Sequence, residues 1–404
     1  MNRTISAWLE RYAVALMLAL VLLPLLGKVV AVAMGSACFG WPSLNYHIGY
    51  ETGFGGRKFV GTLCHLLLPD YVEASHIRIL VIAANALQMA LLVWLYARVV
   101  RTKASAMMTL LYFLGPFSIL AWFDTGMSVI FMETYQLILV VAWLLAYLRW
   151  HGRSGFYAFT LVLCVVCGLI HHTFCCTLMP LVAAMLIYDL WDQGRFSWRR
   201  LAWTAAIGVA MGILLGSIWL FSRMNLPQEE LSARLAATVA PNAYEADPYV
   251  LEVLYYQSNS GNRDASLEVL TRYRLPELVL SLLLLLPLLA VLYWPWVRAA
   301  RKAESHAWRY RLVYLSITLL TMPIFFMATD YGRWFVCWFF GLVVLTLVAL
   351  TRRDALVAEA VDALYAYFRT HWWVALLLAI YLLGLHALSF EGLKEAINIR
   401  QFLL

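Results

Sequence analysis

The feature that most constrains this chain is a series of apolar segments, each close to the length that crosses a membrane as a helix. A bilayer core of about 30 Å requires roughly 20 consecutive apolar residues in an α-helix. Eleven segments approach this length: 13–35, 77–97, 105–122, 128–148, 156–171, 174–190, 200–222, 276–297, 310–328, 334–351 and 372–390. The sequence therefore predicts an all-α polytopic membrane protein with about eleven transmembrane helices, in which residues 1–404 form one integral membrane domain.

The composition excludes an ordinary soluble domain. Only 13% of the residues are charged, whereas soluble domains have about 25%. The net charge is +7. In a membrane protein such an excess reflects Lys and Arg in cytoplasmic loops, so we expect no nucleic-acid partner. The first apolar segment is too long for the core of a signal peptide, and we expect it to be retained as a helix.

The Lys and Arg residues predict the orientation. With a cytoplasmic N-terminus, the cytoplasmic side would carry 18 of the 30 Lys and Arg residues, in turns such as "ARVVRTK", "DQGRFSWRR" and "TRRD". This is the asymmetry that orients membrane proteins. The fifth and sixth segments are less certain, because "CGLIHHTFCC" interrupts one long apolar stretch. A single helix followed by a re-entrant piece is the alternative there.

Two long loops lie on the predicted extracytoplasmic side. Residues 36–76 contain "RKFVGTLCHLLLP", whose apolar residues follow a helical spacing after two cations. This pattern predicts a helix over residues 57–68 that lies in the membrane interface. Residues 223–275 form the larger loop, which we expect to be a small cap of short helices.

Ionisable residues gather near the predicted extracytoplasmic ends of four separate segments. Such residues are costly beside membrane spans and often mark a site or face a wet cavity. Neighbouring helix ends could bring these groups into one cleft. The residues are Glu51, Arg57, Lys58, Asp124, Glu133, His171, His172, Asp330 and Arg333.

Structural roles are the competing interpretation for the charged residues. Arg57 and Lys58 could extend from an interfacial helix to lipid headgroups. Asp124 and Asp330 could cap helices, where such residues are favoured. Asp330 could also pair locally with Arg333.

Glu133 and the two histidines also have structural alternatives. Lys28, within the first apolar segment, could neutralise Glu133. His171 and His172 lie four residues before a Cys pair, a spacing that can hold zinc. Adjacent pairs in an apolar helix are more often involved in packing and hydrogen bonding. We therefore expect no metal at these positions.

Transfer from a lipid-linked phosphate donor fits this set of residues. Arg and Lys at headgroup depth can bind the phosphate and stabilise the charge of the leaving group. A nearby carboxylate can accept the proton of an acceptor hydroxyl. The sequence contains no P-loop, no Rossmann fingerprint and no HExxH motif, so soluble-nucleotide and zincin chemistry are unsupported. We expect no cofactor; a divalent metal stays open but is not indicated.

The arrangement resembles the type C (GT-C) glycosyltransferase superfamily of polyprenyl-phosphate-sugar enzymes and related bacterial surface-polysaccharide enzymes. The resemblance covers the architecture: many spans, and an acid, Glu51, in the first extracytoplasmic loop before the helix at 57–68. It implies a multi-pass protein of the bacterial inner membrane, with an extracytoplasmic site for a hexosyl- or pentosyltransferase of polysaccharide biosynthesis. Many members carry a paired acidic motif in this loop, whereas this chain has the single Glu51.

The resemblance implies roles for individual residues. Glu51 would be the base, with Asp124 or Asp330 as substitutes. The substrate and its phosphate would contact Arg57, Lys58, Arg333, His171, His172, Glu133, Tyr331 and Trp334, the last two by stacking on the sugar. The partners would be a polyprenyl-phosphate-linked sugar donor, a glycan, lipid or protein acceptor, and membrane lipids.

Two other functions stay open. A Wzy-like O-antigen or capsule polymerase would use a lipid-pyrophosphate oligosaccharide, and the arginines of residues 223–275 suit it. A transporter or flippase of a lipid-linked anion is the other alternative. Transporters usually show internal repeats and midplane polar groups, whereas here no repeat is visible and the polar residues gather at one predicted face.

Overall fold

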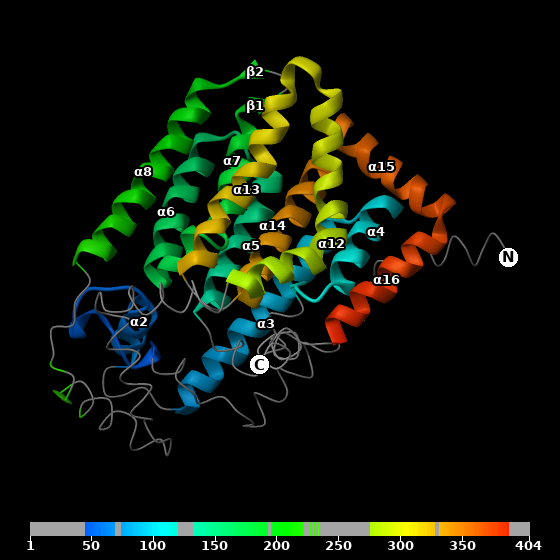
Figure 1. The fold of residues 1–404 in the computed structure, drawn as a ribbon. Helices are drawn as coiled ribbons and strands as arrows, with labels where there is room; N and C mark the ends of the chain where they lie inside the picture. The colour runs from blue at the N-terminus through cyan, green and yellow to red at the C-terminus, as the bar shows by residue number, and fades with distance from the viewer. Residues whose placement is uncertain are drawn as a thin grey trace.

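The computed structural model describes residues 45–68, 74–119, 132–192, 195–221, 275–327 and 331–387, with four single positions between 227 and 233. These residues are almost entirely helical. Two short strands, β1 (Trp191–Asp192) and β2 (Arg195–Phe196), pair antiparallel. The helices form a bundle, with α2 and the strand pair at opposite ends (Figure 1). The predicted all-helical fold is therefore confirmed.

Most helices coincide with predicted apolar segments, but the helix in the segment predicted at 105–122 ends at Leu114, and the helix Ala355–Thr370 was not predicted. The α-helices are α2 (Phe59–Leu67), α3 (Ala74–Val99), α4 (Lys103–Leu114), α5 (Glu133–Trp150), α6 (Ser154–Ile170), α7 (Met179–Asp189), α8 (Trp198–Phe221), α12 (Leu275–Lys302), α13 (Ala307–Met327), α14 (Tyr331–Thr351), α15 (Ala355–Thr370) and α16 (Trp372–Ala387). The 3-10 helices used below are η2 (Tyr50–Thr52) and η5 (His172–Cys175).

Five helical stretches of the described residues are long and apolar enough to cross a membrane. They are Ser75–Val99, His172–Asp189, Trp198–Phe221, Leu278–Lys302 and Gly332–Thr351. The pair α15 and α16, bent by 98°, would make a sixth if it forms one span. These helices fit a multi-pass membrane protein. The count of eleven is not confirmed, and the first predicted span, 13–35, lies outside the described residues.

The motif "CGLIHHTFCC" is a break between two helices. α6 ends at Ile170, and His171 has an extended backbone (φ −157°, ψ 122°). The 3-10 turn η5 follows, and α7 begins at Met179 with a proline in its first turn. Proline is well placed at that position because its missing N–H would have no partner in the helix. The break therefore interrupts the apolar stretch where the two histidines lie.

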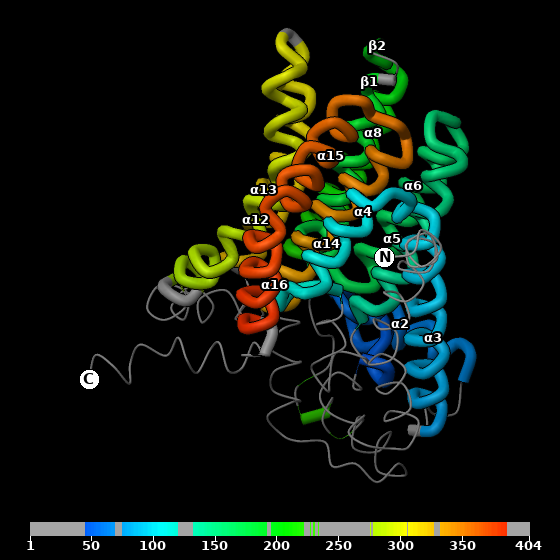
Figure 2. Tube along the Cα trace, turned by 90° about the vertical axis from the view of Figure 1, so that its right-hand side faces the viewer, coloured from blue at the N-terminus to red at the C-terminus, as the bar shows by residue number. Residues whose placement is uncertain are grey.

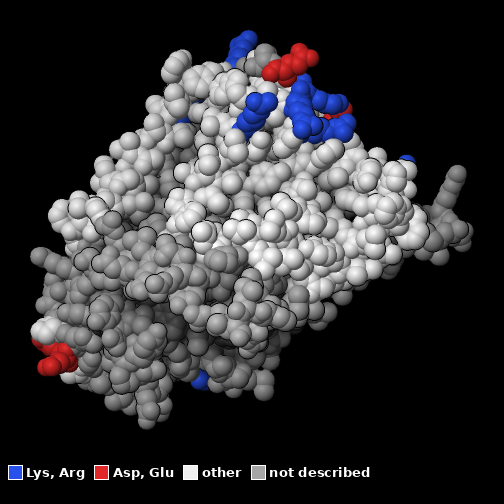
Figure 3. All heavy atoms as spheres, viewed as in Figure 1, with Lys and Arg blue, Asp and Glu red and all other residues white. Residues whose placement is uncertain are grey.

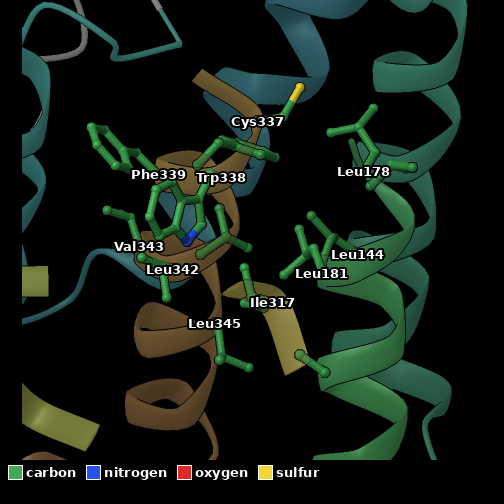
Figure 4. Close-up of a cluster of buried hydrophobic side chains, with 14 of the residues drawn as sticks. Leu144, Leu178, Leu181, Ile317, Cys337, Trp338, Phe339, Leu342, Val343 and Leu345 are labelled. Atoms are coloured by element: carbon green, nitrogen blue, oxygen red, sulfur yellow. The ribbon is translucent and has the colours of Figure 1, made fainter. Parts of the chain in front are cut away.

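The core of the bundle is built around α14. In its spanning stretch 89% of the residues are buried inside the protein, against 17% in α8. Figure 4 shows Phe339, Leu342 and Val343 of α14 beside Ile317 of α13 and Leu181 of α7. In contrast, α8 exposes large apolar side chains along its length. We infer that α14 is enclosed by protein while α8 offers its surface to lipid.

The charged side chains are distributed as a membrane would require. In Figure 3 most of the visible Lys and Arg side chains gather at the end of the bundle where α12 meets α13, and the described surface directly below them carries no charged side chain. Arg301 and Lys302 lie in the last turn of α12. Figure 2 shows α16 running beside α4 after its bend from α15.

A buried polar network ties together α5, α7 and α14 at this basic end. Arg352 donates through Nη1 to Oδ1 of Asp189 and, at 2.7 Å, to the hydroxyl of Tyr147. The Tyr147 hydroxyl also donates to Asp189 at 2.8 Å. Because Asp189 is fully buried, its carboxylate depends on these partners.

The helix predicted over residues 57–68 is present as α2, and its packing depends on a glycine. Leu63, Leu66 and Leu67 are exposed on it. A Cβ added to Gly61 would lie 2.1 Å from the carbonyl oxygen of Ile48. Only glycine therefore lets α2 approach the backbone of the preceding segment. The predicted cap helices of residues 223–275 lie almost entirely outside the described residues.

Replacing Gly61 by alanine should destabilise the protein by about 1–3 kcal/mol, as overpacking does, because the carbonyl of Ile48 must move. The measurement is the free energy of unfolding of the purified protein in detergent. Gly208→Ala on α8 is the matched control, because its added methyl meets nothing within 4 Å. An equal loss in both variants would contradict the proposed close approach.

Replacing Arg352 by glutamine should cost about 3–5 kcal/mol, because Asp189 is left as a buried charge without its cation. The double variant Arg352→Gln/Asp189→Asn should regain part of this loss, since no charge then stays buried. Detergent-to-SDS unfolding of the wild type and of the single and double variants tests this. A double variant less stable than Arg352→Gln alone would show that the pair does not act as a unit.

Candidate functional site

A second buried charged cluster lies at the other end of the bundle, where four separate segments meet. Glu133 is the first residue of α5, and His171 caps the end of α6. Arg333 lies in the first turn of α14, and Arg57 lies just before α2. α2 contacts α6 in this region. Segments far apart in sequence therefore contribute to one site.

Glu133 is the electrostatic centre of this cluster. Its Oε1 lies 3.0 Å from Nη1 of Arg333 and 3.8 Å from Nε2 of His171. Arg57 donates through Nε to Nε2 of His171. Glu133 is only 2% exposed and Arg333 only 14%. Among the described residues of this cluster, two guanidinium groups thus accompany one carboxylate.

The loop before α2 packs closely against His171 and His172. A Cβ on Gly56 would lie 2.4 Å from Nδ1 of His172, and the rings of His171 and His172 stack with centroids 4.9 Å apart. Arg57 has a left-handed backbone, with φ 67°. Such a conformation is uncommon for a residue with a side chain and persists where surrounding contacts impose it, often at functional sites.

Gln136 fixes the end of α6 and was not among the predicted site residues. Its Nε2 donates to the carbonyl oxygens of Cys167 at 2.8 Å and of His171 at 2.7 Å. Gln136 lies three residues after Glu133, on the same side of α5. This spacing from Glu133 was the one signal in the sequence that could have indicated Gln136 as a site residue.

Several buried polar atoms around the cluster lack a hydrogen-bond partner in the described part of the chain. They are Oε1 of Gln136, Nδ1 of His172 and Nε1 of Trp334. The guanidinium of Arg333 lies 5.3 Å from the ring centroid of Trp334. Buried polar groups are normally satisfied, so each exception calls for an explanation such as a ligand or water.

Glu51 and Lys58 are held differently from the Glu133 cluster. Oε1 of Glu51 lies 3.0 Å from Nδ1 of His65, and the Glu51 side chain is 37% exposed. Lys58 is buried and donates from Nζ to the carbonyl of Gly53 at 2.9 Å. Lys58 therefore does not extend to lipid headgroups. Burial lowers the pKa of Lys58 from 10.5 to about 8, and the nearby Glu51 partly opposes this.

The remaining predicted site residues are placed only in part. Asp124 and Asp330 lie outside the described residues, as does Lys28, and the side chain of Tyr331 is not described. Trp334 is buried, so its ring is not open to a sugar in this state. Glu133 has Arg333 as a partner. Within the described ranges, no group of three or more His, Cys, Asp or Glu side chains could hold a metal.

Comparisons with protein-family models, with curated proteins and with solved structures found no match. The function is therefore argued from the side chains of this chain alone.

Lys58 should contribute a rise in stability with pH. Its pKa is lower in the folded state, so the unfolded chain binds more protons between about pH 8 and 10.5. The free energy of unfolding should increase through that window. Lys58→Met should lose this rise when melting temperatures at pH 7.5 and pH 9.5 are compared, whereas Lys103→Met, at an exposed position, should keep it. An unchanged rise in Lys58→Met would assign the titration to another group.

Proposed function

We propose that this protein is a membrane glycosyltransferase that moves a sugar from a polyprenyl-phosphate-linked donor to a glycan, lipid or protein acceptor at the extracytoplasmic face. The observation that carries the proposal is the buried cluster of Arg57, His171, Glu133 and Arg333 at one end of an apolar helix bundle. Two guanidinium groups at the end of a membrane-compatible bundle suit an anionic lipid headgroup.

Phosphate fits the chemistry of the cluster better than a neutral ligand does. Guanidinium groups bind phosphate oxygens through paired, charge-assisted hydrogen bonds. α5 and α14 both begin here, and the N-termini of helices favour anions. Nε1 of Trp334 is a buried donor without a partner in the described part of the chain. A phosphate at the cluster would meet donors from several elements.

The surroundings suit a donor that is partly embedded in lipid. α2 follows directly after Arg57 and exposes Leu63, Leu66 and Leu67. These side chains would lie against acyl or prenyl chains at the depth of the headgroups. The phosphate would then sit at the cluster while the isoprenoid tail stays in the bilayer.

The same loop supplies a carboxylate for the proton transfer of the proposed reaction. Glu51 lies six residues before Arg57 and is partly exposed, so an acceptor hydroxyl can approach this side. Glu133 is buried and paired with Arg333, and we assign it to holding the cations in place. Asp124 and Asp330 stay as alternative bases.

The lipid-pyrophosphate polymerase would use the same cluster with a different donor. The transporter would also need to bind the anion, but without cleaving it. Activity with a lipid monophosphate donor against a lipid pyrophosphate donor separates the transferase from the polymerase. Binding of the lipid without turnover distinguishes the transporter from both.

Replacing Arg57 or Arg333 by glutamine should weaken the binding of polyprenyl phosphate about 10- to 100-fold, since a hydrogen bond to a charged group is worth about 1.5–3 kcal/mol. Binding would be measured in nanodiscs by native mass spectrometry, with the uncharged polyprenol as the reference ligand. Arg369→Gln, at an exposed position of α15, is the matched control.

Equal binding of polyprenyl phosphate and polyprenol by the wild type would contradict the proposed function. Binding without release of sugar from any polyprenyl-phosphate donor, but with movement of the lipid between leaflets, would favour the transporter instead.

A further inference from the structure

Glu51 and His65 form a second polar unit, in the two short helices that precede and follow Arg57 in the chain. Oε1 of Glu51, in η2, lies 3.0 Å from Nδ1 of His65, in the last turn of α2. Both side chains are partly exposed, at 37% and 31%. The pair lies outside the helices of spanning length.

The backbone around this pair is held firmly, so its geometry does not depend on the pair alone. The N–H of Tyr50 donates to the hydroxyl of Thr62 at 2.8 Å, and that hydroxyl donates to the carbonyl of Lys58 at 2.8 Å. Gly61 allows α2 to meet the carbonyl of Ile48. η2 and α2 therefore form one unit that presents Glu51 to His65.

The carboxylate of Glu51 is directed toward its own turn. Its Oε1 accepts the N–H of Gly49 at 2.9 Å in addition to Nδ1 of His65. A Cβ on Gly49 would lie 2.1 Å from Oε2, so the second oxygen also faces the backbone. An incoming hydroxyl would have to compete with these contacts to reach Glu51 directly.

The imidazole has the opposite arrangement. An ionised carboxylate can only accept a hydrogen bond, so Nδ1 of His65 carries the proton of this contact. Nε2 is then the basic nitrogen, on the side of the ring away from Glu51. A carboxylate that holds a histidine in this way fixes its tautomer and stabilises the imidazolium that forms when Nε2 takes a proton.

We propose that His65 is the proton acceptor of the transfer reaction and that Glu51 is its positioning residue; this rests on the proposed function. The proton of the acceptor hydroxyl passes to Nε2 of His65 while the acceptor oxygen forms its bond to the anomeric carbon. The bond between that carbon and the phosphate oxygen breaks, and its electron pair leaves with the phosphate held by Arg57 and Arg333.

The charged surroundings of the pair favour this assignment. Lys58 faces Glu51, and His47 faces His65. Burial, together with His65, lowers the pKa of His47 to about 4, so His47 stays neutral near pH 7. α6, which packs against α2, contains no Asp, Glu, Lys, Arg or His. Among the described residues, Glu51 is therefore the acidic side chain that contacts His65.

The test compares His65→Asn, Glu51→Gln and the control His371→Asn, a histidine at the bend between α15 and α16, in the full-length protein. The probe is a panel of radiolabelled polyprenyl-phosphate sugars, and the readouts are kcat/KM against pH and the binding of polyprenyl phosphate. His65→Asn should lose activity about 100- to 10,000-fold, as loss of a general base does, with unchanged lipid binding. Retained binding shows that the site is folded.

Glu51→Gln should lose less activity, and the pH at which kcat/KM falls on the acid side should move lower, because the imidazolium has lost its carboxylate. A purely structural role for Glu51 would not move that limb. Normal turnover in His65→Asn with inactive Glu51→Gln would overturn the proposal and make Glu51 the base. Normal turnover in both variants, with Arg57→Gln inactive, would also overturn it but leave the proposed function intact. Failure of the wild type to bind the phosphate lipid would remove both.

Discussion

The structure depends on the pairing of Glu133 with Arg333 inside an apolar bundle. A carboxylate at 2% exposure is stable there only with a cation and further hydrogen bonds close by. The pairing of Glu133 with Arg333 brings the beginnings of α5 and α14 together. Nε2 of His171, at the end of α6, lies 3.8 Å from the same Glu133 oxygen. Arg57 then reaches His171 from the loop before α2. The buried charge of Glu133 thus organises the site that we assign to a phosphate.

The same principle operates at the other end of the bundle with a different result. Asp189 is fully buried and is held by Arg352 and Tyr147. There Oδ1 of the carboxylate accepts from Arg352 and Tyr147, which suits a structural clasp, while Oδ2 has no hydrogen-bond partner in the described part of the chain. At the Glu133 end, buried polar atoms of Gln136, His172 and Trp334 stay unpaired among the described residues. We place the ligand at the Glu133 end because two guanidinium groups, those of Arg57 and Arg333, accompany one carboxylate there.

The sequence predicted the helices well, because apolar runs bounded by charged turns have few other solutions in a membrane. It also indicated the ionisable residues near the helix ends. It could not say which of them pair: Arg333 contacts Glu133, 200 residues away, while the sequence suggested the nearby Asp330 or, for Glu133, Lys28. Gln136 and His65 were missed for the same reason. Each acquires its role from a partner that only the folded chain brings near.

The break between α6 and α7 has a consequence for how this region can vary. In a continuous helix, successive side chains point about 100° apart, so two adjacent histidines could not lie with their rings stacked. The extended backbone at His171 and the 3-10 turn after it allow that stacking. Substitutions of Thr173 and Cys176 by better helix formers would therefore separate the two imidazoles and disrupt the site, although Arg57, Glu133 and Arg333 were unchanged.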